Sequence, residues 1–165
     1  MKPALLVIDV QKDFFEGGDV QRKSLKDAVW GINQVVKLFR GLNLPVVYVQ
    51  HMNEAEDLKP GNPGFDLPDE FDVRPEDIRI TKVYGNSFNK TGLHEKLQAL
   101  GVDTLILTGF CAEWCVLSTY RGAEDLDYKP ILVLGTVASG NLENLRFVES
   151  ISEVVSVDAL KTLMG

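Results

Sequence analysis

The sequence predicts an α/β fold: a single domain over residues 1–165, with three layers in which helices cover both faces of a mainly parallel, six-stranded sheet. Short apolar runs of the kind found in strands alternate with longer amphipathic runs of the kind found in helices. The length of 165 residues suits one domain with its own core, and no repeat or low-complexity tract divides it.

The amino-terminal half begins with a strand at Ala4–Val10, whose aliphatic residues suit a strand buried on both faces. Ser24 is expected to cap the next helix, in which apolar residues recur at helical spacing, and Gly41 is expected to end it. Pro45–Gln50 is the second strand. The stretch Asn53–Glu76 is rich in Pro, Gly and acidic residues and predicts one long loop, a feature that is commonly functional in compact domains.

The carboxyl-terminal half continues the alternation. Gly101 is expected to end the helix predicted at Thr91–Leu100, since glycine is the usual residue after a helix. The expected strands are Ile78–Lys82, Thr104–Thr108, Pro130–Leu134 and Val154–Val157; the expected helices are Thr91–Leu100, a segment ending near Asp125, and Asn141–Ser152.

Charge and composition exclude several classes of partner. The net charge is −7 and no basic run occurs, so nucleic acid and anionic membranes would be repelled and the expected partner is a small-molecule substrate. The apolar run Ala4–Ile8 has only five residues before Asp9 interrupts it, too short for a signal segment or a membrane span. We expect a cytoplasmic protein.

The two cysteines are Cys111 and Cys115, four residues apart on one segment. A disulfide framework would join distant parts of a chain, so the spacing favours reduced thiols and a cytoplasmic location. Two thiols make only half of a zinc site, and no second pair of cysteines exists. A structural zinc site is therefore not expected.

Polar side chains are predicted at the ends of several strands. Asp9, His51 and Lys82 end the first three strands, and Cys115 lies early in the helix after the fourth. Parallel strands end at one edge of the sheet, where α/β proteins bind their ligands. A position near a helix start, with a lysine on the same edge, favours a cysteine thiolate.

Asp9 and Cys115 could also have purely structural roles. Asp9 could cap a helix or accept loop hydrogen bonds, and Cys115 could be a small buried apolar residue. A different catalytic arrangement is possible as well. His51 and Cys115 could form a Cys–His dyad, which would leave Asp9 and Lys82 without a role.

Three segments together resemble the isochorismatase-like hydrolases, the superfamily that includes nicotinamidases and N-carbamoyl amidases. They occur in the order in which that superfamily has them, and they extend over most of the chain. The segments are LVIDVQKDF at Leu6–Phe14, KVYGNSFNKTGL at Lys82–Leu93 and TGFCAEWCV at Thr108–Val116.

The resemblance implies a role for each matching residue. Asp9 would be the general base, Lys82 would hold Asp9 and favour the thiolate, and Cys115 would be the nucleophile that forms a covalent intermediate. The backbone N–H groups of Cys111 and Cys115 would form the oxyanion hole. The resemblance also implies a cis peptide bond between Phe110 and Cys111.

The resemblance suggests further features of the site and its assembly. The resemblance implies that four aromatic residues line the substrate pocket: Phe14, Tyr84, Phe88 and Phe110. Aromatic residues are also common in protein cores. Members of the superfamily commonly assemble, so a homo-oligomer is expected, a dimer or larger. The loop from Asn53 to Phe71 is long enough to close the pocket of a neighbouring copy.

The sequence departs from the superfamily at three places. Nicotinamidases have an Asp-x-His pair and a further histidine that bind a metal, whereas this chain has QHMN at Gln50–Asn53. We therefore expect no metal and no other cofactor. Ala112 replaces a usual threonine. True isochorismatases typically lack the cysteine, so Cys115 favours an amide or carbamoyl substrate.

The leading hypothesis is a metal-independent cysteine hydrolase of a small amide, carbamoyl or related C–N substrate. A non-catalytic binding or assembly protein with the same fold is one alternative, and a nicotinamidase-type amidase is another. A nucleotide-binding Rossmann protein is excluded, because no G-x-G-x-x-G follows the first strand, where VQKD stands at Val10–Asp13.

Overall fold

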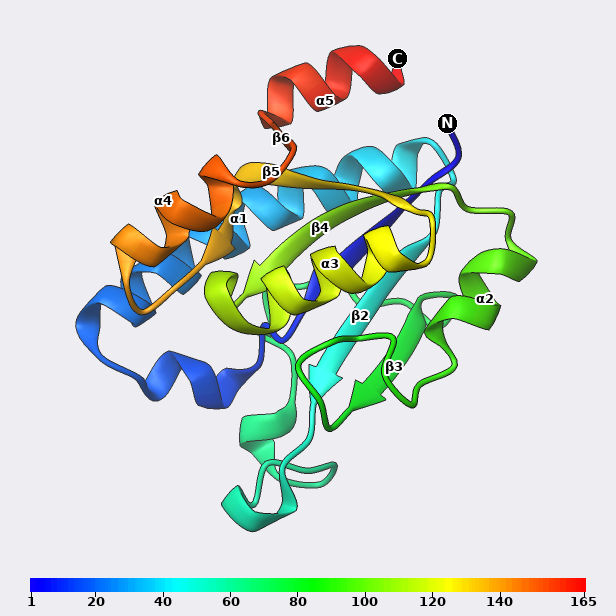
Figure 1. Ribbon diagram of the computed structural model, residues 1–165. Helices are drawn as coiled ribbons and strands as arrows, with labels where there is room; N and C mark the ends of the chain where they lie inside the picture. Colours follow the sequence, from blue (N-terminus) through cyan, green and yellow to red (C-terminus); the bar gives the residue numbers. More distant parts are fainter.

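The computed structural model describes residues 1–165 and has the predicted α/β architecture (Figure 1). Six strands form one sheet in the order β3-β2-β1-β4-β5-β6, and every strand pair is parallel. The strands are β1 (Pro3–Ile8), β2 (Val46–His51), β3 (Ile78–Lys82), β4 (Thr104–Phe110), β5 (Lys129–Ala138) and β6 (Val154–Val155).

Five α-helices cover the two faces of the sheet, and Figure 1 shows α1 behind the strands and α3 in front of them. One core layer holds α1 and α5, and the opposite layer holds α2, α3 and α4. Leu5 and Val7 of β1 belong to the first layer, while Leu6 and Ile8 belong to the second, as the alternation along a strand requires. The helices are α1 (Asp19–Gly41), α2 (Leu93–Ala99), α3 (Leu117–Asp125), α4 (Leu142–Ser150) and α5 (Val157–Met164).

The predicted long loop connects β2 to β3 and projects from the carboxyl end of β2 (Figure 1). It contains only two short 3-10 helices, Glu54–Glu56 and Pro63–Phe65. The buried side chains of Phe65, Leu67 and Phe71 anchor the loop. None of the helices combines the length and the apolar character that crossing a membrane requires.

The start of α1 differs from the prediction. The helix begins at Asp19, with Gly18 at the N-cap, so Ser24 lies inside the helix and does not cap it. The Ser24 hydroxyl instead accepts a hydrogen bond of 3.1 Å from the backbone N–H of Ser139. A hydroxyl that satisfies a distant backbone group looks, in the sequence, the same as one that caps a helix.

The carboxyl-terminal elements also differ. β5 runs past the predicted end at Leu134, because Gly135 adopts a φ of 78° and the pairing of β5 with β4 shifts register there. β6 has only two residues, and the helix α5 that follows it was not predicted. Ser156 caps α5 by accepting a hydrogen bond of 3.1 Å from the Ala159 N–H.

Candidate functional site

The site lies where β1 and β4 are neighbours although they are far apart in the chain, the kind of switch point at which open α/β sheets bind ligands. Asp9 follows β1 directly and has a φ of 50°, which is uncommon for a residue other than glycine. Gly109 of β4 has a φ of 116°, and a Cβ atom there would lie 2.0 Å from the Ile8 carbonyl oxygen. Only glycine therefore lets β4 approach the end of β1 this closely.

The Lys82 ammonium group joins the strand ends. Its Nζ atom donates to Asp9 Oδ2 at 2.8 Å and to Cys115 Sγ at 3.4 Å, and lies 3.1 Å from His51 Nδ1. The side chains of Lys82 and Asp9 are 0% and 2% exposed. The structure thus brings together Asp9, Lys82 and Cys115 as predicted, and an ammonium group has one N–H for each of its three partners.

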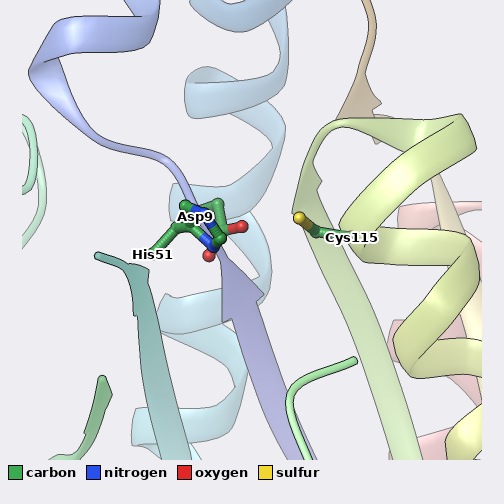
Figure 2. A group of neighbouring side chains, drawn as sticks. All are labelled: Asp9, His51 and Cys115. Carbon is green, nitrogen blue, oxygen red and sulfur yellow. The ribbon is translucent and has the colours of Figure 1, made fainter. Parts of the chain in front are cut away.

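Cys115 reaches this group from a π-helical turn, Ala112–Val116, that leads into α3. Single π-helical turns are frequent at functional sites. Figure 2 shows the Cys115 sulfur directed from this turn toward Asp9 and His51 at the ends of β1 and β2. The peptide bond between Phe110 and Cys111 is cis, as the resemblance implies.

The ionisation of Cys115 differs from the expectation of a stabilised thiolate. Burial and the neighbouring Asp9 carboxylate together raise the pKa of Cys115 to about 12, and they outweigh the favourable effect of Lys82. Burial also raises the pKa of Asp9, against the opposing attraction of Lys82. Asp9 Oδ1 is buried and has no hydrogen-bond partner. The resting site therefore pairs a neutral thiol with a carboxylate of increased basicity.

His51 also contacts Lys82. Because the ammonium can only donate, His51 Nδ1 accepts and its ring proton lies on Nε2. Burial, followed by the charge of Lys82, lowers the pKa of His51, so the ring is neutral. Buried Gln11 holds the backbone of His51 from both sides, accepting from its N–H at 2.7 Å and donating to its carbonyl at 3.0 Å. No hydrogen bond joins His51 to Cys115, so the Cys–His dyad is not formed.

A pocket of about 360 Å³ opens over this group. Two of the four predicted aromatic residues, Phe14 and Phe110, line it, with ring centroids 5.2 Å apart. The remaining lining residues are Asp9, Gln21, His51, Glu56, Leu58, Cys111, Glu113, Trp114, Cys115 and Gly140.

Tyr84 and Phe88 do not line this pocket. The Tyr84 hydroxyl accepts a hydrogen bond from Lys90 on the outer surface. Phe88 stacks on Tyr128 with ring centroids 5.7 Å apart and packs against the core layer that holds α2, α3 and α4. The resemblance suggested both aromatics, which follow Lys82 in one of the three matching segments, but it did not show which way each ring points.

Sequence reasoning did not identify two acidic residues that line the pocket, Glu56 and Glu113. Glu113 lies between the two cysteines, and Glu56 lies in the long loop, whose length was the only signal. Together with Leu58, Glu56 brings the loop against this chain's own pocket.

The site does not fit a metal ion. One possible ligand atom from each of Asp9, His51 and Cys115 lies within 4.8 Å of the others, a spacing that three metal ligands could have. The Lys82 ammonium, however, is within hydrogen-bond distance of all three side chains and supplies the positive charge there. A divalent ion would have to displace a buried ammonium or lie beside it, which is electrostatically costly.

Known proteins resemble this chain over most of its length. The family model for the isochorismatase domain matches residues 3–150. The isochorismatase family protein YddQ of Bacillus subtilis is 31% identical over 146 residues, 87% of this chain and 81% of its own length. A protein of Arabidopsis thaliana named a probable inactive nicotinamidase is 33% identical over 151 residues, 79% of this chain and 77% of its own length.

Solved structures show the same fold. An isochorismatase-like hydrolase from Alkaliphilus metalliredigens has a TM-score of 0.89 and 25% identity, with 100% of both chains covered. N-carbamoylsarcosine amidase from Thermoplasma acidophilum has a TM-score of 0.83 and 28% identity, covering 96% of this chain and 98% of that one. Because the family model matches most of the length of this chain, the chain belongs to the isochorismatase family of hydrolases.

Proposed function

We propose that the protein is a metal-independent cysteine hydrolase that cleaves a small amide, carbamoyl or related C–N substrate through a covalent intermediate on Cys115. The observation that carries the proposal is the buried Lys82 ammonium, which contacts both the Asp9 carboxylate and the Cys115 sulfur, two side chains that line the pocket. The amidase among the structural relatives supports a C–N bond as the target.

The first half of the proposed reaction forms the covalent intermediate. Asp9 takes the proton of the Cys115 thiol, and the sulfur attacks the substrate carbonyl carbon. The raised pKa of Asp9 makes its carboxylate a better proton acceptor for this step. The raised pKa of Cys115 keeps the thiol protonated until the substrate arrives. The C–N bond then breaks, and the leaving nitrogen takes the proton from Asp9.

The second half releases the acid. Water attacks the thioester carbon while Asp9 takes one of its protons, the C–S bond breaks, and Asp9 returns the proton to the Cys115 sulfur. Lys82 remains protonated throughout and compensates the negative charge that moves between Asp9 and the sulfur. We assign the oxyanion hole to the backbone N–H groups of Cys111 and Cys115, since both residues line the pocket.

A substrate screen tests the proposal. Small amides, carbamoyl compounds and ureides are assayed for ammonia release by wild type, by Cys115→Ala and by the matched control Cys111→Ser. Wild type and Cys111→Ser are expected to release ammonia, since a serine hydroxyl can replace the Cys111 thiol as donor to Glu113, and Cys115→Ala is expected to release none. Full activity in Cys115→Ala would exclude the mechanism. Failure to hydrolyse any of these compounds would favour the alternative of a non-catalytic binding protein.

A further inference from the structure

The charges around the pocket define a substrate class. We propose that the pocket selects substrates with a positively charged group, such as an amine or a guanidine, next to the C–N bond that is cleaved, and that it disfavours carboxylates. The inference rests on the proposed function, because it concerns the substrate of the same site.

The pocket carries negative charge that no cation balances. Its lining includes the carboxylates of Glu56 and Glu113 and no lysine or arginine, and neither glutamate forms a salt bridge. Lys82 is already paired with Asp9 at 2.8 Å. Arg121, which lines an adjoining pocket with Glu113 and Trp114, is paired with Glu124 at 2.8 Å. Two uncompensated carboxylates attract a cationic ligand and repel an anionic one.

Glu113 is held in the pocket wall by neutral donors. Its carboxylate accepts hydrogen bonds from Cys111 Sγ at 3.0 Å, from Ser139 Oγ at 2.7 Å and from Asn144 Nδ2 at 3.0 Å. Burial acts to raise the pKa of Glu113, but these hydrogen bonds outweigh it and the pKa is lower than usual. Neutral donors fix the position of the carboxylate without cancelling its charge. The charge is therefore available to a ligand.

The other walls suit the carbon skeleton of such a substrate. Phe14, Leu58 and Phe110 provide apolar surface, and Trp114 lies next to Glu113 with 71% of its surface exposed. An indole ring and a carboxylate that line the same pocket form a favourable environment for an alkylammonium or guanidinium group. A carboxylate substrate would find no basic partner among these residues.

Two thiol reagents of nearly equal size and opposite charge test the inference on the wild-type chain. The cationic reagent is 2-(trimethylammonium)ethyl methanethiosulfonate, and the anionic one is 2-sulfonatoethyl methanethiosulfonate. Each forms a disulfide with the cysteine sulfur and releases methanesulfinate. Peptide mass spectrometry follows the rate at which each reagent modifies Cys115, and each rate is divided by that of the same reagent with 2-mercaptoethanol. The ratio of interest is the normalised rate of the cationic reagent divided by that of the anionic one. Both reagents meet the same thiol, so its pKa cancels from the ratio.

We expect the cationic reagent to modify Cys115 at least tenfold faster than the anionic one at low salt. Glu113→Gln and Glu56→Gln should each lower the ratio several-fold, and the double variant should lower it further, to the small preference that the remaining net negative charge of the chain leaves. Glu56 is exposed, so its replacement does not threaten folding. The matched control is Glu95→Gln, an exposed carboxylate on α2 outside the pocket, which should leave the ratio unchanged. High salt should reduce the preference of the wild type.

Equal rates for the two reagents, or a ratio that the Glu56 and Glu113 variants do not change, would overturn the inference and leave the hydrolase proposal intact. Conversely, ammonia release that survives in Cys115→Ala would overturn the hydrolase proposal while the charge preference stands. Among compounds that the enzyme hydrolyses, those with an amine should exceed carboxylates of equal length at least tenfold in kcat/KM. The opposite order would also refute the inference.

Discussion

Replacing Lys82 by Met tests the buried ion pair at the centre of the site. The substitution keeps an unbranched apolar stem but removes the ammonium group, so the Asp9 carboxylate, 2% exposed, loses its only cationic partner. The folded variant must bury that charge or neutralise it by binding a proton. At pH 7, protonating a carboxyl whose unfolded pKa is about 3.9 costs about 4 kcal/mol, which sets the upper limit of the charge penalty.

The penalty should depend on pH. In Lys82→Met the folded-state pKa of Asp9 lies above its unfolded value, because burial raises it and the opposing effect of Lys82 is absent. Such a group favours folding most at low pH, below its unfolded pKa, and this advantage is lost as the pH rises. The deficit relative to wild type should therefore shrink by up to about 1.4 kcal/mol for each pH unit below 7.

Urea unfolding followed by circular dichroism at pH 5 and pH 7 measures the effect. At pH 7 a loss at the upper limit of about 4 kcal/mol corresponds to a Tm lower by about 8 to 16 °C for a chain of this size. The matched control is the double variant Asp9→Asn and Lys82→Met, which has no buried charge and should regain most of the lost stability while remaining inactive. Wild-type stability of Lys82→Met at pH 7, or a loss that does not change with pH, would refute the reasoning.

Four further predictions concern the ionisation of Cys115, metal binding, assembly and the contact between β4 and β1. Iodoacetamide should modify Cys115 with an apparent pKa well above the ~8.5 of a free thiol, and Asp9→Asn should lower it; a wild-type value at or below 8.5 would contradict the effect of burial and of Asp9. Chelators should not reduce activity, because the Lys82 ammonium supplies the positive charge of the site. Stoichiometric zinc, iron or manganese bound through His51 would contradict this prediction. We propose a homo-oligomer, which a monomer in light scattering at micromolar concentration would exclude. Gly109→Ala should cost more than about 3 kcal/mol in urea unfolding, since its Cβ would meet the Ile8 carbonyl; near-wild-type stability would contradict the close approach of β4 to β1.

The sequence alone determined the fold and the position of the site. Aliphatic runs such as the one in β1 specify strands buried on both faces, and their alternation with amphipathic runs specifies a parallel sheet. Because all strands of a parallel sheet end at one edge, residues that follow them meet there however far apart they are in the chain. That rule is enough to bring Asp9, Lys82 and Cys115 together.

Only the tertiary structure decided what surrounds these residues. Whether Ser24 caps its own helix or holds Ser139, and whether Phe88 enters the pocket or stacks on Tyr128, depends on packing between distant segments. The ionisation of Cys115 likewise depends on how deeply the sulfur is buried and how close the Asp9 carboxylate lies. Periodicity along a chain records which face of an element is apolar, but burial and side-chain contact arise only when the elements pack together.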